Sequence, residues 1–322
     1  MRAVKKYLAL FGVSLFGAAL LAEAGLRVFG AFVPPTVQPL RPELYRADAE
    51  LGYTLNPSTT VKYAYPVNSS NIITATSNSD GFRNPREFDE PDVRPRIWFL
   101  GDSMVLGEGV EAEDRLTEVI GRLEPGWRVD NFGMSGWGLD LMVRAFEKVS
   151  RRVMPNVTVL AFYTDDFRRL RPRYTGMGYA LPRFELTNGS LVDLPPPGPL
   201  PAWRRLRVVQ AVEQTYWRFA RNQYALNGAL LDRLKGKADG RSRLLVVFVP
   251  GRADTDEDRR RRGFLNEWCR RNTIPYLDLT ETMKAAGVES LHIPGNYHWN
   301  QHGHEVAGTA IHRFIRESGA IR

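Results

Sequence analysis

A serine in the first half of the chain and a group of histidines near its end are the residues whose types suggest chemistry. Ser103 ends a Gly-Asp-Ser motif directly after the apolar run 97–100, and four of the five histidines lie between His292 and His304. Serine is a weak nucleophile until a base removes its proton. A serine and a histidine that the fold brings together are therefore the minimum pair for acyl transfer.

The clustered histidines have a second interpretation, a metal site. His302 and His304 fall at the start of a helix-like segment without an accompanying set of carboxylates or cysteines, and His304 followed by Glu305 is typical of helix packing or capping. The pattern favours catalysis over metal binding. We expect neither a metal nor a cofactor.

Apolar strand-like runs alternate with helix-like segments around these residues. By itself, Gly-Asp-Ser is typical of an ordinary turn from strand to helix, so the rest of the chain must show whether Ser103 is a candidate nucleophile. The expected strands are 97–100, 127–131, 157–163, 244–249 and 274–277. Helical spacing is seen at 112–123, 136–153, 203–234 and 254–271, and a last amphipathic helix runs to about 315. The segment 203–234 is interrupted near Asn227-Gly228. This alternation predicts an α/β fold, a three-layer doubly wound parallel sheet.

Polar and glycine residues follow the first three of these strands, at Ser103, at 131–136 and at 164–166. The carboxyl ends of parallel strands meet at one edge of the sheet, where open α/β sheets bind ligands. We therefore expect Ser103 and the two later loops to converge.

Two segments fall outside the alternation. Residues 43–94 form an N-terminal extension in which 51–83 predict short strands at an edge of the fold, closed by a turn at 78–83 that Phe82 anchors in the core. Residues 171–201 form an insertion in which Asn188-Gly189 predicts a two-residue hairpin turn. A long segment after such a strand often covers the site, so a lid is one interpretation of the insertion.

The amino terminus has the pattern of an export or anchoring signal. Basic residues precede the uncharged apolar segment 7–22, and a weaker apolar continuation reaches residue 33. Glu23 and Arg27, one helical turn apart, can pair. The favoured interpretation is an uncleaved anchor, 1–33, contacting the membrane through 7–33, followed by a proline-containing linker, 34–42. The alternative is a cleaved signal peptide, because Ala22-Glu23-Ala24 fits a cleavage site.

Either interpretation places the domain 43–322 outside the cytoplasm under the positive-inside rule. The favoured anchor predicts an inner-membrane protein with its domain on the periplasmic side. The formal charge of +8 does not indicate a nucleic-acid partner, because the densest arginine run, 259–262, lies among acidic residues on a helix-like segment. The single cysteine, Cys269, excludes an intrachain disulfide, and burial is its expected role.

The chain resembles the SGNH (GDSL-type) hydrolases, and within them the bacterial membrane-anchored proteins that carry an Asn-Ser-x-Gly-Phe-Arg element, here 78–83, ahead of the catalytic domain. The resemblance runs from about residue 50 to the end of the chain. Its four blocks are the nucleophile block with Gly101-Asp102-Ser103 and Gly107–Val110, the second block 131–136, the third block 163–166, and the histidine block His298-Trp299-Asn300 with Gly303-His304. The resemblance implies that Ser103 is the nucleophile, that His298 is the base, and that the backbone N–H groups of Ser103 and Gly136 hold the oxyanion.

Two positions depart from the family pattern. The third block normally has an asparagine that donates to the oxyanion, where this chain has Asp165. An ionised carboxylate offers only acceptors, and loss of one such donor costs about 10² to 10³ in rate, unless the carboxyl stays protonated in an apolar site. The acid that normally precedes the histidine is Asn296 here, and that exchange costs about 10⁴ in a serine protease. Ser103 and His298 can still act as a dyad, or Asp165 can supply the carboxylate from another side.

The sequence thus predicts an exported serine esterase, acyl hydrolase or acyltransferase. The expected substrate is an ester-bearing small molecule or glycan, such as an acyl or acetyl group on a cell-envelope glycan or lipid. The alternative, motivated by Asp165 and Asn296, is a catalytically impaired protein that keeps the fold to bind envelope carbohydrate or a protein partner.

Overall fold

A five-stranded parallel sheet forms the centre of the fold. The structure is a computed structural model, and it describes residues 2–29, 42–67, 69–170, 173–175, 177–218 and 224–321. The strands are β5 (Arg96–Gly101), β6 (Arg128–Gly133), β7 (Val157–Tyr163), β10 (Arg243–Val249) and β11 (Tyr276–Asp278). Their spatial order, β11-β10-β7-β5-β6, reverses between β5 and β7. The predicted doubly wound α/β fold is confirmed, and its ligand-binding position is expected at this reversal.

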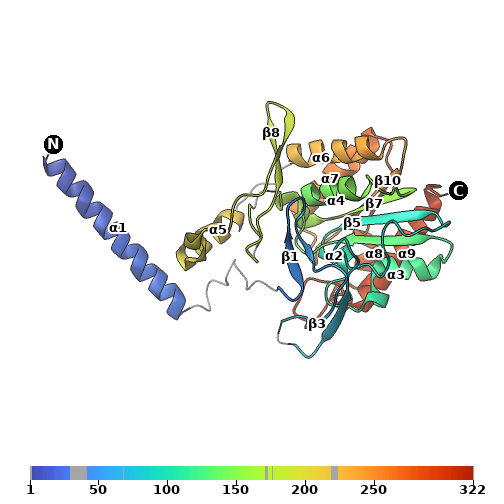
Figure 1. Ribbon diagram of the computed structural model, residues 1–322, viewed down its shortest axis with the longest axis horizontal. Coiled ribbons are helices and arrows are strands. Elements are labelled where there is room, and N and C mark those ends of the chain that lie inside the picture. The colour runs from blue at the N-terminus through green and yellow to red at the C-terminus, as the bar shows by residue number, and fades with distance from the viewer. Residues whose placement is uncertain are drawn as a thin grey trace.

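Helices cover both faces of the sheet (Figure 1). They are α2 (Ser103–Leu106), α3 (Leu116–Leu123), α4 (Leu139–Val149), α6 (Tyr224–Ala238), α7 (Asp256–Arg271), α8 (Thr280–Ala285) and α9 (Gln301–Glu317). One buried cluster contains residues of α4, α6 and α7, and a second contains residues of α3, α8 and α9. The three layers arise because each helix carries an apolar stripe that can be buried only against the sheet.

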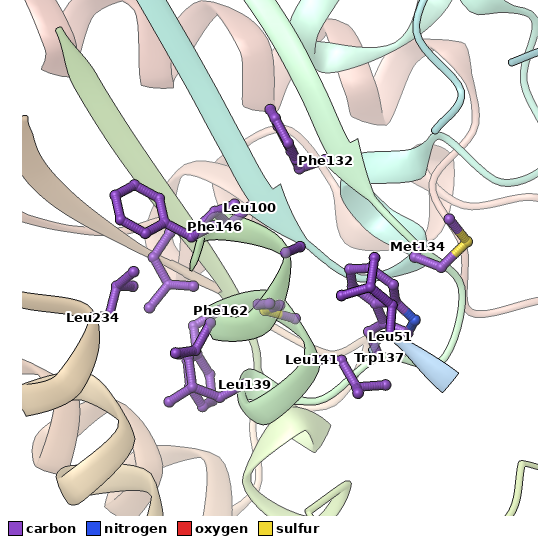
Figure 2. Close-up of a cluster of buried hydrophobic side chains, with 14 of the residues drawn as sticks. Leu51, Leu100, Phe132, Met134, Trp137, Leu139, Leu141, Phe146, Phe162 and Leu234 are labelled. Atoms are coloured by element: carbon purple, nitrogen blue, oxygen red, sulfur yellow. The ribbon is translucent and has the colours of Figure 1, made fainter. Parts of the chain in front are cut away.

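Figure 2 shows part of the first cluster, in which Leu100, Phe132 and Phe162 of the sheet lie with Leu139 and Phe146 of α4. All five side chains are fully buried. Burial of a side chain of this size contributes about 1.5–3 kcal/mol. The packing of α4 on the strands therefore holds the ends of β5, β6 and β7 in register beneath the site.

The N-terminal extension forms two antiparallel hairpins, β1 (Tyr45–Asp48) with β2 (Gly52–Leu55), and β3 (Thr60–Ala64) with β4 (Ile72–Thr76). Each hairpin is a separate two-stranded sheet. The short strands predicted within 51–83 are confirmed as β2, β3 and β4, and within the described residues they do not pair with the central sheet. Each hairpin joins the core through buried side chains, such as Tyr53 of β2 and Ile73 of β4. The predicted anchor is confirmed: Phe82 is fully buried, and its N–H donates to Asn78 Oδ1 at 3.0 Å.

The insertion forms the predicted hairpin, β8 (Arg183–Thr187) with β9 (Ser190–Leu194), and Asn188 and Gly189 occupy its turn with positive φ angles of 51° and 79°. Phe184 of β8 is buried beneath the guanidinium groups of Arg144 and Arg233, from α4 and α6. The lid interpretation of this insertion stays a prediction.

Helix α6 corrects the sequence prediction of a break near Asn227-Gly228, because it runs through both residues. Asn227 is buried, and its Nδ2 donates to the carbonyl of Phe167 at 3.2 Å. A tertiary partner for the amide thus outweighs the low helix propensity of Asn and Gly. The segment 203–234, for which the sequence predicts helical structure, also includes α5 (Arg207–Arg218) ahead of α6.

The N-terminal helix α1 (Arg2–Val28) extends away from the domain and contacts α5 (Figure 1). Its residues Val4–Val28 are long and apolar enough to cross a membrane, by length and composition. The predicted pair forms, with Arg27 Nε 2.7 Å from Glu23 Oε1, and Glu23 Oε2 also accepts the N–H of Val208 at 3.0 Å. The end of the predicted anchor and nearly all of the linker 34–42 lie outside the described residues.

Candidate active site

Ser103 is the first residue of α2, directly beyond the carboxyl end of β5. Asp102 caps this short helix, since its Oδ1 accepts the N–H of Met104 at 2.9 Å. The helix lies so close to β6 that a Cβ on Gly133 would come within 2.1 Å of the Leu106 nitrogen. The close packing holds Ser103 at the point where the strand order reverses, and leaves its surface only 2% exposed.

The loop before α9 brings His298 to this serine. His298 Nε2 lies 2.8 Å from Ser103 Oγ, within the range of a hydrogen bond, although 195 positions separate the two residues in the chain. The loop is closed by a hydrogen bond of 2.9 Å from the N–H of Ile293 to the carbonyl of His298. Burial lowers the pKa of His298, and the carboxylates of Glu108 and Asp102 oppose this effect. At neutral pH the ring is therefore uncharged, the state in which Nε2 can accept a proton from serine.

Two neutral groups contact the other ring nitrogen of His298. Asn296 Oδ1 lies 3.0 Å from Nδ1, and the hydroxyl oxygen of Tyr65 lies 2.5 Å from it. The side-chain amide of Asn296 also donates to this hydroxyl at 3.3 Å. The position of a catalytic acid is thus filled by an amide and a phenol.

Charged side chains lie beside Ser103 at the ends of two strands, β5 and β7. Arg169 Nη1 lies 2.6 Å from Asp102 Oδ2 and 2.8 Å from Asp166 Oδ1, and Asp102 Oδ2 lies 3.4 Å from Ser103 Oγ. Burial and the neighbouring Asp102 raise the pKa of Asp166 well above its ordinary value. Arg169 therefore offsets the charge of Asp102 beside the nucleophile and ties β5 to the loop after β7.

The predicted oxyanion donors have free N–H groups. Among the residues that the structure describes, no acceptor is bonded to the backbone N–H of Ser103 or of Gly136. Asp165, at the position where the SGNH pattern has an asparagine, forms ion pairs with Arg168 and with Arg261, the latter at 3.2 Å. The expectation that Asp165 could supply the missing carboxylate to His298 is not met. Asp165 is paired with the two arginines, and among the described residues the carboxylate that reaches 4.0 Å from the imidazole is that of Glu108.

Glu108 and Tyr297 complete the surroundings of His298. Glu108 Oε2 lies 4.0 Å from Nε2 and accepts a hydrogen bond from the Ser135 hydroxyl. The ring of Tyr297 lies beside the imidazole, with 4.1 Å between the ring centroids, and the residue is 49% exposed. Tyr297 is therefore a partly exposed side chain in direct contact with the buried histidine.

The neighbouring histidines have structural contacts. His304 is buried, its Nδ1 accepts the N–H of Leu116 at 3.3 Å, and its ring packs on Trp299. Burial lowers the pKa of His304 to about 3. The part of the chain that the structure describes contains no group of three or more histidine, cysteine, aspartate or glutamate side chains that could hold a metal ion.

Sequence analysis missed Tyr65, Glu108 and Arg169 as site residues. The signal for Glu108 was its place within the Gly107–Val110 motif, and the signal for Arg169 was its place three positions after the third block. Tyr65 carries no local signal, since it reaches His298 across 233 positions of the chain. The structure brings together Ser103, His298 and Asn296 as expected, but the catalytic and oxyanion roles predicted for them stay predictions.

No protein-family model matches the chain, and no curated protein does. Solved structures are similar to it at low identity. A putative lipolytic protein of the G-D-S-L family from Desulfitobacterium hafniense is 13% identical, with a TM-score of 0.44, over 69% of this chain and 99% of that one. A lipase/acylhydrolase from Enterococcus faecalis is 15% identical, with a TM-score of 0.46, over 70% and 97%.

A third similar structure is Est24, a carbohydrate acetylesterase from Sinorhizobium meliloti, which is 11% identical with a TM-score of 0.45 over 70% of this chain and 100% of that one. The sheet order of the present chain agrees with the doubly wound fold that its sequence predicts. The activity of the present chain is argued from its own residues.

Proposed function

We propose that this chain is a serine hydrolase or acyltransferase that acts on an ester. The observation that carries the proposal is the distance of 2.8 Å between Ser103 Oγ and His298 Nε2, because a positioned base within hydrogen-bond reach is what makes a serine nucleophilic. The lowered pKa of His298 supports it, since the base must be neutral to accept a proton.

The first half of the reaction forms a covalent intermediate. Ser103 Oγ attacks the ester carbonyl carbon while its proton passes to His298 Nε2. The negative charge that develops on the carbonyl oxygen is held by the N–H groups of Ser103 and Gly136. The imidazolium then donates its proton to the departing alcohol, which leaves an acyl group on Ser103.

The second half removes this acyl group by the same steps in reverse. Water or a second alcohol attacks the acyl carbon, and His298 takes the attacking proton and returns it to Ser103. With water the outcome is hydrolysis, and with an alcohol it is acyl transfer. An acyl or acetyl ester on a cell-envelope glycan or lipid is the proposed substrate class.

The membrane position of the site is part of the proposal. The length and apolar composition of α1 support an N-terminal anchor, with Arg2, Lys5 and Lys6 on the cytoplasmic side and the domain in the periplasm. A substrate in the cell envelope would then be on the same side as Ser103.

The test is covalent labelling of the full chain in detergent with a small fluorophosphonate, followed by peptide mass spectrometry. We expect an adduct on Ser103, and none in the variants Ser103→Ala and His298→Ala. We also expect the wild-type chain to hydrolyse p-nitrophenyl acetate and both variants to lack this activity. A folded wild-type chain that is neither labelled on Ser103 nor active on this ester would contradict the proposal.

The second candidate is a binding protein that has lost catalysis. The ion pairs of Asp165 at the usual oxyanion-donor position and the absence of a carboxylate at His298 Nδ1, within the described residues, favour it. If it is correct, the double variant Asp165→Asn with Asn296→Asp should create ester hydrolysis that the wild type lacks. If the wild type is already active, the same double variant should change the rate little or lower it.

A further inference from the structure

The orientation of the Asn296 amide decides which ring nitrogen of His298 carries the proton. Asn296 Oδ1 accepts the backbone N–H of His298 at 3.0 Å, so this atom must be the oxygen of the amide. The same oxygen lies 3.0 Å from Nδ1. An amide oxygen can only accept, and therefore Nδ1 carries the proton and Nε2 is left to accept from Ser103.

Tyr65 supplies a second oxygen to the same N–H. Burial raises the pKa of Tyr65, so its hydroxyl stays protonated and uncharged. A hydroxyl oxygen has two acceptor positions, which accommodate the Asn296 amide and the proton on Nδ1. Both partners of Nδ1 are neutral, and they can orient the ring but cannot balance an imidazolium charge.

The hairpin that carries Tyr65 is fastened to the loop after α2. The side-chain amide of Asn71 donates to the carbonyl of Tyr65 at 2.9 Å and to the carbonyl of Gly109 at 3.2 Å. A Cβ on Gly109, whose φ is +93°, would come within 2.8 Å of the Tyr65 ring and 2.3 Å of Ile293. The glycine therefore makes room for Tyr65 against the histidine loop.

Glu108, the residue before this glycine, places a carboxylate on the opposite side of the imidazole. Its Oε2 lies 4.0 Å from Nε2, and its side chain is 12% exposed. An opposite charge at about 4–6 Å raises the pKa of a histidine by about one to three units. The titratable and charged groups around His298 are Tyr65, Glu108, Asp102, Arg169, His292, Tyr297 and His304.

Of these groups, only Glu108 and Asp102 bear negative charge, and Arg169 is bonded to Asp102 at 2.6 Å. No basic side chain within the described residues is paired with Glu108, whose hydrogen-bond donor is the neutral Ser135 hydroxyl. Glu108 is thus the uncompensated carboxylate beside the histidine.

We propose that two sets of residues divide the two tasks that a triad carboxylate normally performs: Asn296 and Tyr65 orient His298, and Glu108 balances the charge of the imidazolium. All three are positioning residues, because they act through His298. The inference rests on the proposed function for its catalytic meaning, but the tautomer and the charge balance are properties of the ring that can be measured without a reaction.

The test titrates His298 in the full chain, labelled with 13C-histidine and held in detergent micelles, by the NMR shift of its ring, assigned with His298→Gln. The variants are Glu108→Gln, Tyr65→Phe and Asn296→Asp, and the rate of Ser103 labelling by a fluorophosphonate is followed against pH in each. Glu108→Gln keeps an acceptor for Ser135, which preserves the local fold. Glu281→Gln, which removes an 82% exposed carboxylate of α8, is the matched control.

Glu108→Gln should lower the pKa of His298 by about one unit or more, and it should slow labelling at pH 7 by up to about tenfold for each unit. Tyr65→Phe should shift this pKa by less than about half a unit, because no charge is removed, and it should slow labelling by up to about tenfold through lost orientation. Asn296→Asp should raise the pKa of His298. In the Glu108→Gln background, the same substitution should return this pKa toward its wild-type value.

Equal pKa values of His298 in Glu108→Gln and Glu281→Gln would overturn the charge-balancing role. An unchanged labelling rate in Tyr65→Phe would overturn the orienting role. If the wild type is not labelled on Ser103 while its His298 pKa still responds to Glu108→Gln, the proposed function fails and the charge balance stands.

Discussion

The N-terminal extension and the hairpin insertion are both additions to the same five-stranded core, yet they meet it in different ways. The extension contacts the site from two hairpins: the Tyr53 hydroxyl donates to the carbonyl of Ser135, next to Gly136, and the Tyr65 hydroxyl contacts His298. The insertion instead places Phe184 against α4 and α6. The extension thus contacts the candidate site itself. The insertion packs on the outer helices and also on the extension, because the ring of its Tyr179 stacks on Tyr53 with 5.5 Å between the centroids.

Arg83 shows how firmly the extension is joined to the nucleophile loop. The side chain is 1% exposed, and its guanidinium donates to the carbonyls of Gly107 at 2.7 Å, of Val110 at 2.9 Å and of Thr74 at 2.7 Å. The arginine of the Asn-Ser-x-Gly-Phe-Arg element is thus a structural tie between β4 and the loop that carries Glu108. The sequence predicted the turn and its anchor Phe82, but not this role of Arg83.

Among the variants that test how the two additions are attached, Arg83→Ala should have the largest effect on stability. It leaves several buried carbonyls without a donor, and each such group costs about 1–3 kcal/mol. We expect the free energy of unfolding, measured by urea denaturation, to fall by about 3 kcal/mol or more. A loss below about 1 kcal/mol would show that the extension is not held by this side chain.

Gly109→Ala should have an intermediate effect, and Gly189→Ala in the insertion is its matched control. Both glycines have positive φ, which costs an alanine about 1–2 kcal/mol. A Cβ on Gly189 meets nothing within 4 Å, whereas one on Gly109 would collide with Tyr65 and Ile293. Both variants should lose stability in thermal unfolding, but only Gly109→Ala should also slow the labelling of Ser103.

Equal labelling rates in Gly109→Ala and Gly189→Ala would contradict the view that the extension positions His298 through Tyr65. A slower rate in both would show that the insertion affects the site as well, as the lid interpretation predicts.

Asp193→Asn should give the smallest effect. Asp193 of β9 pairs with Arg144 of α4, and its side chain is 55% exposed. Exposed ion pairs contribute about 0–1 kcal/mol. We expect a change in the free energy of unfolding of less than about 0.5 kcal/mol and an unchanged labelling rate, measured beside Arg83→Ala under the same conditions.

The acid limit of stability offers a further check on the core beneath the site. The pKa of buried His304 is lowered to about 3 from an unfolded value of about 6.5. A lowered pKa means that the neutral ring is favoured in the folded state, so its contribution is complete above pH 6.5 and is lost as the pH falls toward 3. His304→Gln should flatten the decline of Tm across this interval, and an unaltered decline would assign it to other groups.

Most of the fold was predictable because the pattern of each element is local. Each core strand is a short apolar run that ends in polar or glycine residues, and each helix carries an apolar stripe, so the α/β alternation follows from the chain itself. Ser103 was predictable for the same reason, since the motif directly follows β5. The break expected at Asn227-Gly228 was wrong because the contact of Asn227 with Phe167 is tertiary.

The sequence by itself determined the doubly wound sheet, the Ser103 and His298 blocks, and the two departures at Asp165 and Asn296. Only the tertiary structure decided what fills the place of the missing acid: Tyr65 on one side of the imidazole and Glu108 on the other. Strands and helices arise from neighbours in the chain, but the state of a histidine depends on which dipoles and charges lie within about 4–6 Å of it. Folding alone brings those groups together from distant parts of the chain.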